Sequence, residues 1–158
     1  MDLRQANLAW SWLGHILMCA LAAWALFRGG LTERTATAIV GLGWVITPLL
    51  QSKGVVGLDL GTTSVDLVVF VLLTWLSCRT RKLWVLFASS SILLGVAGHF
   101  SVMLTDDVSL PAYISNNGFW SGYMLLFALF IGMVNAERTR LSNQSSTNMR
   151  TRAKTPLR

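Results

Sequence analysis

Charged residues are scarce in this 158-residue chain, at 13% of the total, against about 25% in ordinary soluble domains. Hydrophobic residues make up 53% of the chain, and they stand in long runs. Such runs are typical of membrane spans, whereas a soluble domain breaks its apolar residues into helical or strand periods. The strands of a transmembrane barrel alternate apolar and polar residues, and these runs do not. The sequence therefore predicts an all-α fold, a polytopic transmembrane helical bundle.

Cysteines and catalytic motifs are also scarce. The two cysteines, Cys19 and Cys78, provide neither a disulfide framework nor a paired-cysteine metal motif. The glycine-rich stretches GLGWVITPLL and GLDLGTTS do not follow a strand, as a phosphate-binding loop would. With no catalytic triad or nucleophile motif in the sequence, we expect a protein that is not an enzyme.

Five apolar runs predict the spans. They cover residues 8–27, 35–50, 60–78, 83–104 and 119–135. The first run is longer than the apolar region of a signal peptide and follows a weakly charged start, so we expect it to be retained. Residues 1–135 then form the transmembrane domain, and the polar, basic residues 136–158 form a tail expected to be disordered.

The second run is the weakest, because it is short and contains Gly41, Gly43 and Pro48. The alternative is a bundle of four spans with a re-entrant second segment, since glycine and proline are tolerated in membrane helices and do not decide the matter. Five spans are favoured because these apolar residues would otherwise need another place to be buried.

The cations indicate the orientation. Their position beside the apolar runs and in the tail is typical of a cytoplasmic membrane edge, so we expect no nucleic-acid partner despite the net charge of +6. Five spans place eleven of the thirteen cations inside and leave Arg4 and Lys53 outside, whereas four spans give ten inside and three outside. The prediction is a protein of the plasma (inner) membrane, with its N-terminus outside and its C-terminus cytoplasmic. The tail cations are expected to bind anionic lipid; they are Arg138, Arg140, Arg150, Arg152, Lys154 and Arg158.

Tryptophans lie near the ends of several predicted spans. This placement predicts an aromatic belt at the two membrane interfaces. The belt would consist of Trp10, Trp12, Trp24, Trp75, Trp84 and Trp120.

Three ionisable residues fall inside the predicted spans: His15, Asp66 and His99. Such residues are costly in a membrane and are candidates for function. In the five-span arrangement they lie roughly 10, 9 and 8 Å below the outer ends of their spans, so they would share one layer. Each also belongs to a stripe with a spacing of four residues, which shares one helical face. We expect these stripes to face inward; they are Ser11–His15–Cys19, Asp66–Phe70–Thr74–Cys78 and Ser91–Gly95–His99.

Three interpretations of this layer remain open. The residues could form hydrogen bonds that hold helices together. His15 and His99 could instead be axial ligands of a b-type haem, with Gly95 giving the macrocycle room, or could bind a metal together with Asp66 and Cys19, although no metal-ligand spacing motif is present. Asp66 could also carry an ion or proton, although the chain has no internal repeat.

Small residues in the last span predict close helix packing. Gly118 and Gly122 form a GxxxG pattern, and Ala128 and Gly132 form a second small stripe. Together with the missing catalytic motifs, they favour a non-catalytic accessory or assembly subunit, with other membrane subunits or a second copy as its partner. The alternatives are a haem- or metal-binding redox protein using His15 and His99, and a small oligomeric transporter using Asp66.

Overall fold

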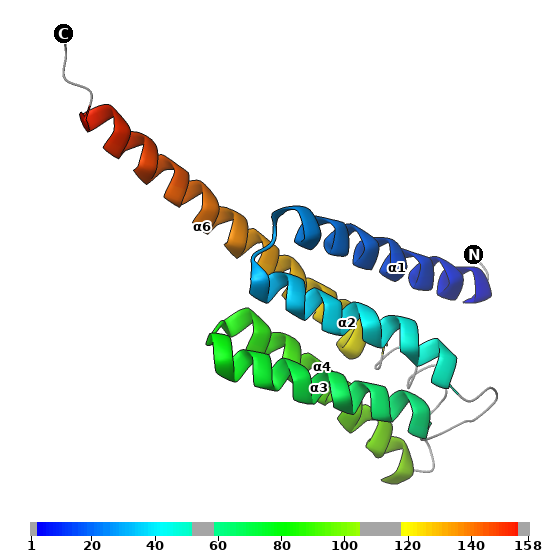
Figure 1. The fold of residues 1–158 in the computed structure, drawn as a ribbon. Coiled ribbons are helices and arrows are strands. Elements are labelled where there is room, and N and C mark those ends of the chain that lie inside the picture. The colour runs from blue at the N-terminus through cyan, green and yellow to red at the C-terminus, as the bar shows by residue number, and fades with distance from the viewer. Residues whose placement is uncertain (1–2, 52–58, 105–117, 155–158) are drawn as a thin grey trace.

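Every element in the described part of the chain is a helix. The computed structural model describes residues 3–51, 59–104 and 118–154. The elements are α1 (Leu3–Arg28), α2 (Leu31–Leu50), α3 (Leu60–Thr80), α4 (Leu83–Leu104), the π-helix η1 (Gly118–Met124) and α6 (Leu125–Lys154). They lie side by side, and successive long helices are antiparallel (Figure 1). The all-α bundle predicted from the sequence is confirmed.

Helix α2 runs the whole length of the bundle. Near its start, Glu33 contacts Lys82 in the turn between α3 and α4. At its end, the carbonyl oxygen of Leu50 approaches Gly61 at the start of α3 so closely that a Cβ on Gly61 would lie 2.2 Å from it. These two contacts are at opposite ends of α3, so α2 does not turn back on itself. The helix begins earlier than the predicted second run, at Leu31. It is not among the four described segments that are long and apolar enough to cross a membrane, so the choice between five spans and four stays a prediction.

The glycines of α2 explain how it fits between its neighbours. Gly41 and Gly43 are two residues apart and thus face directions about 200° apart on the helix. A Cβ on Gly41 would lie 3.1 Å from Met18 of α1, and one on Gly43 would lie 2.9 Å from Val69 of α3. The missing side chains let α2 approach helices on both sides.

The outer surface of the bundle is apolar. Four segments are long and apolar enough to cross a membrane: Leu8–Arg28, Leu60–Thr80, Leu83–Ser101 and Gly118–Ser146. Large apolar side chains in the middle of these segments are exposed, including Ile16, Val68 and Phe127. A soluble monomer rarely exposes apolar surface so extensively. The chain is therefore a helical membrane protein whose outer face contacts lipid.

Trp84 is a core residue and does not belong to the predicted aromatic belt. Only 6% of it is exposed, and its indole ring lies directly over Gly132 of α6, where a Cβ would come within 2.7 Å of two ring atoms. The glycine opens a slot that accepts the ring. Trp75, at the other side of the same turn, is exposed and lies against the guanidinium of Arg79.

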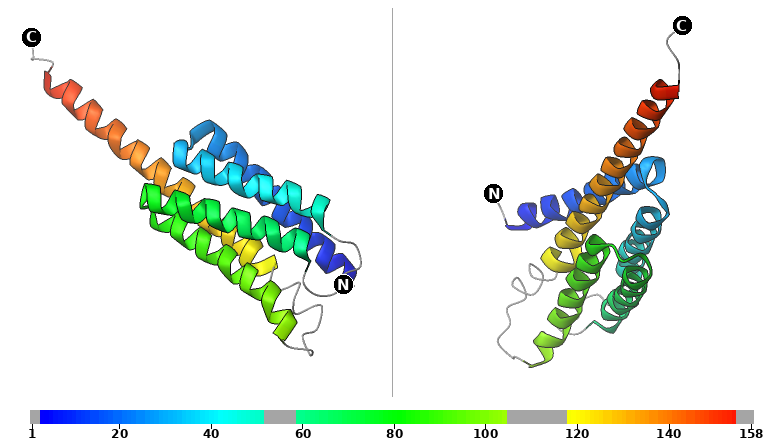
Figure 2. Two further views of the ribbon diagram at one scale, coloured as in Figure 1. Left: turned by 60° about the horizontal axis from the view of Figure 1, so that its bottom comes forward. Right: turned by 90° about the vertical axis from the view of Figure 1, so that its left-hand side faces the viewer.

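The last helix differs from the prediction of a span over 119–135 followed by a disordered tail. After η1, helix α6 continues without interruption to Lys154, and its C-terminal half extends beyond the other helices (Figures 1 and 2). No glycine or proline occurs between Gly132 and Pro156 to end the helix. Two of its hydroxyl groups bond to the helix's own backbone: Thr139 donates to the carbonyl of Asn135 at 2.9 Å, and Ser146 donates to that of Ser142 at 2.7 Å.

Candidate functional site

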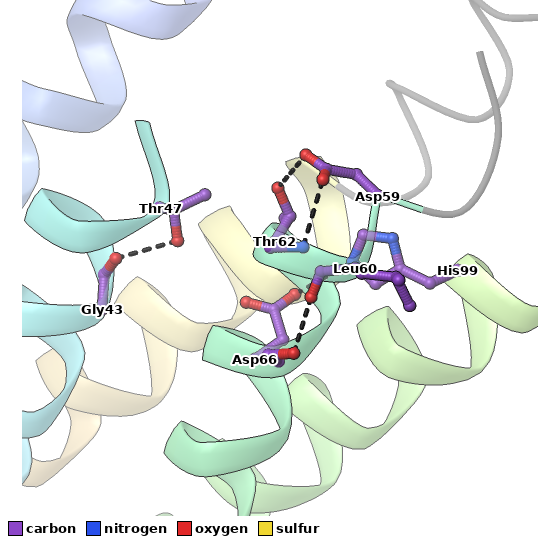
Figure 3. Close-up of polar contacts among 9 residues, drawn as sticks. Gly43, Thr47, Asp59, Leu60, Thr62, Asp66 and His99 are labelled. Carbon is purple, nitrogen blue, oxygen red and sulfur yellow. Dashed lines mark hydrogen bonds and ion pairs between the residues drawn. The ribbon is translucent and has the colours of Figure 1, made fainter. Parts of the chain in front are cut away.

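Asp66 and His99 form a pair between α3 and α4. Asp66 lies two turns into α3, and His99 lies shortly before the end of the antiparallel α4, so the two meet near one end of the bundle (Figure 3). His99 Nε2 and Asp66 Oδ2 are 3.2 Å apart, and the side chains are 1% and 13% exposed respectively. A carboxylate and an imidazole buried together reduce the cost of placing either in a membrane. Two of the three ionisable residues predicted to share a layer are thus in contact.

The start of α3 beside this pair is held by Asp59. Its carboxylate accepts hydrogen bonds from the amide of Gly61 at 3.1 Å and from the hydroxyl of Thr62 at 2.9 Å (Figure 3). Such an N-cap satisfies donors that a helix start leaves unpaired. The cap fixes where α3 begins and therefore where Asp66 faces α4.

A second polar contact joins the same two helices further along. The hydroxyl of Thr74 donates to the carbonyl of Phe70 at 2.8 Å, so its oxygen accepts from Ser89 at 2.7 Å. The stripe of Ser91, Gly95 and His99 is buried, as predicted. Ser89 lies outside this stripe and was not predicted, and the run of three serines at 89–91 was the only signal for it.

His15 is placed differently from the prediction. Ser11, His15 and Cys19 are all exposed, so this stripe of α1 faces outward. The Nδ1 atom of His15 is 2.7 Å from the carbonyl oxygen of Ser11, and its ring lies edge-on to Trp44 of α2. The inward face of α1 is instead small and apolar and contains Gly14, Met18, Leu21 and Ala25, because close packing drives helix association in lipid.

This geometry limits what the pair can do chemically. A haem iron would reach His99 only if the α3–α4 interface opened, because the side chain is 1% exposed and Nε2 faces Asp66. No three His, Cys, Asp or Glu side chains gather as a metal-binding group in the described part of the chain. The contact at 3.2 Å ties α3 and α4 together across their interface.

The predicted packing residues lie in different surroundings. Ala128 and Gly95 are buried, and Gly132 lies under Trp84. Gly118 is near the indole nitrogen of Trp10, whereas a Cβ on Gly122 would have nothing within 4 Å in the described structure.

A second polar group at the opposite end of the bundle was not predicted. Lys82 Nζ and Glu33 Oε1 are 2.7 Å apart, and Arg28 and Glu137 form an ion pair at 2.9 Å. The partners are separated by 49 and 109 residues, so local spacing carries no signal for them. These contacts place the α1–α2 turn, the α3–α4 turn and the exit of α6 at one end, as the distribution of cations predicted.

Comparison of the chain with protein-family models, with curated proteins and with solved structures finds no match.

Proposed function

We propose that this chain is a non-catalytic accessory subunit of a membrane complex and that the C-terminal end of α6 contacts the partner. The observation that carries the proposal is the extension of α6 beyond the bundle (Figures 1 and 2). We use "the α6 arm" for residues 145–154, which follow Gln144, the last residue that lies near the bundle end. The arm is ten residues long, a length of about 15 Å.

The arm extends beyond the packed part of a helix of 30 residues. In proteins most helical stability comes from packing, and a helix that is polar all round bridges between domains, is held by side-chain pairs or is unstable. A partner would therefore stabilise the arm. The arm sequence SSTNMRTRAK contains Arg150, Arg152 and Lys154 and no acidic residue. An acidic protein surface would stabilise this helix through complementary charge.

The direction of the arm favours a protein over the membrane surface. Helix α6 continues nearly in line with its membrane segment instead of bending across the bundle end (Figure 1). The arm therefore points away from the lipid headgroups, and among the tail cations only Arg140, near the helix exit, remains proposed to bind anionic lipid. The cation-rich end is proposed to face the cytoplasm of a cell bounded by an inner membrane.

The test is the size of the native particle. Membranes containing the full-length protein are solubilised in mild detergent, and the particle mass is measured by native electrophoresis and light scattering. We expect an assembly larger than the 17.4 kDa chain and its detergent, and we expect the triple variant R150E/R152E/K154E to release the chain as a monomer. The matched control is R150K/R152K, which keeps the charge and should keep the assembly.

Two results would count against the proposal. A wild-type chain that is monomeric under these conditions would exclude a stable accessory role. An assembly that survives the triple charge reversal would show that the α6 arm is not the contact.

A further inference from the structure

A cleft opens at the cation-rich end of the bundle, where α1 ends, α2 and α4 begin and α6 leaves. Its volume is about 1200 Å³, which is ample for a small ligand, since such pockets commonly measure about 300–1,000 Å³. We call it the basic-end cleft. Its lining includes the charged and polar residues Arg28, Glu33, Lys82, Asn135, Thr139 and Arg140, together with the apolar Leu83, Trp84 and Ala136.

The charge of the cleft lining is positive. Three cations line it, Arg28, Lys82 and Arg140, against a single carboxylate, Glu33. Glu33 is buried and already paired with Lys82 at 2.7 Å, and Arg28 is paired with Glu137 at 2.9 Å. Arg140 is exposed and forms no ion pair with any other residue in the described structure. The cleft therefore has an excess of cations and a guanidinium that is available to a ligand.

The start of α2 adds backbone donors at this end of the bundle. No side chain forms a capping hydrogen bond after Gly30, although the Glu33 carboxylate lies close by, 2.8 Å from where a Cβ on Gly30 would be. Amides that a helix start leaves unpaired can bind an anion. At the end of α1, the carbonyl of Ala25 accepts from the amide of Gly29 at 2.9 Å and from Arg34 at 3.3 Å.

Exposed apolar side chains lie at the cleft or next in sequence to its residues. Leu83 lines the cleft and is 82% exposed. Phe27 and Leu31, next in sequence to Arg28 and Gly30, are 83% and 84% exposed. Cations beside exposed apolar side chains match an amphiphile with an anionic head and an apolar chain.

We propose that the basic-end cleft binds a phosphate group, carried either by an anionic phospholipid headgroup or by a small soluble phosphate ester. Arg140 and Arg28 bind its oxygens through their guanidinium groups, as arginine does at phosphates, and Lys82 adds a point charge. The amides of the first turn of α2 supply neutral donors. The site does not depend on the α6 arm, so it can exist whether or not the proposed partner does.

The test compares two arginines on the same helix. Arg138 and Arg140 are both exposed, but only Arg140 lines the cleft. Native mass spectrometry of the full-length protein measures binding of phosphatidylglycerol against phosphatidylcholine, and calorimetry measures binding of glycerol phosphate. We expect R140Q to weaken binding about five- to tenfold, the usual effect of one cation near an anionic headgroup, and R138Q to weaken it less than about twofold.

Each outcome decides the proposal. A preference for phosphatidylglycerol that R140Q reduces and R138Q does not supports the site with a lipid as its source of phosphate. Glycerol phosphate binding with the same sensitivity and no lipid preference supports the site with a soluble source. Equal losses in R140Q and R138Q would overturn the proposal in favour of non-specific charge attraction, and so would the absence of both kinds of binding.

Discussion

Replacing Gly132 with alanine should destabilise the bundle, because the new methyl group would collide with Trp84. A Cβ at this position lies 2.7 Å from Cδ2 and Cε2 of the indole and 2.9 Å from Cε3, whereas carbon atoms pack best at about 3.5–4.0 Å. The ring would have to move by roughly 1 Å, and it is a rigid side chain that is only 6% exposed. Overpacking of this kind costs about 1–3 kcal/mol, against a helix-propensity gain of up to about 1 kcal/mol for alanine.

The expected net loss is up to about 2 kcal/mol in the free energy of unfolding after the full propensity gain is subtracted. It is measured by denaturant-induced unfolding in detergent, followed by far-UV circular dichroism. Gly122→Ala is the matched control, because a Cβ there has no atom within 4 Å in the described structure. In a W84F background the cost of Gly132→Ala should shrink, since the smaller ring can yield. Equal stability of the two alanine variants, or a cost unchanged by W84F, would refute the proposed steric cause.

The remaining predictions concern the buried pair and the orientation of the chain. In a double-mutant cycle of D66N and H99Q, the coupling free energy of unfolding should be about 1–2 kcal/mol, while the exposed His15→Gln should change stability by less than about 0.5 kcal/mol. A coupling free energy near zero would mean that the contact between Asp66 and His99 contributes nothing to the stability of the bundle. With both native cysteines replaced by alanine, Q5C should react with a membrane-impermeant maleimide on intact cells, and S146C only after permeabilisation. Labelling of S146C on intact cells would contradict the proposed orientation.

The helix boundaries were largely predictable because the signals for them are local. The predicted spans 60–78 and 83–104 agree with α3 (Leu60–Thr80) and α4 (Leu83–Leu104) to within two residues. Asp59 caps one helix, and the cations after Cys78 end it, with Arg81 in the left-handed conformation that closes the turn. Helix α6 was mispredicted because its polar second half has no apolar period, yet it contains nothing that would stop a helix already begun in the membrane.

The sequence predicted which face of a helix points into the bundle only where that face carries an ionisable residue that requires a partner. Asp66 is costly in lipid unless it is paired, so its presence on α3 correctly indicated a contact across the interface, which the structure identifies as His99. His15 lies 2.7 Å from the backbone carbonyl of Ser11, so it has a polar contact within its own helix and no need of a neighbouring one. The face of α1 that points into the bundle is instead the one that contains Gly14, where a Cβ would be 3.2 Å from Trp44.

The same reasoning explains why the basic-end cleft could not be read from the sequence. From the sequence one can predict only that the carboxylates of Glu33 and Glu137 each require a cation nearby. The chain contains thirteen lysine and arginine residues that could supply it. The choice of Lys82 and Arg28 depends on which helix ends meet, and that in turn depends on α2 traversing the bundle. Had α2 turned back on itself, its start and its end would lie at the same end of the bundle, and the contact between Glu33 and Lys82 would not follow from the position of Leu50 beside Gly61. The glycines that made α2 the weakest predicted span are therefore the residues that let it pack along its full length and complete the cleft.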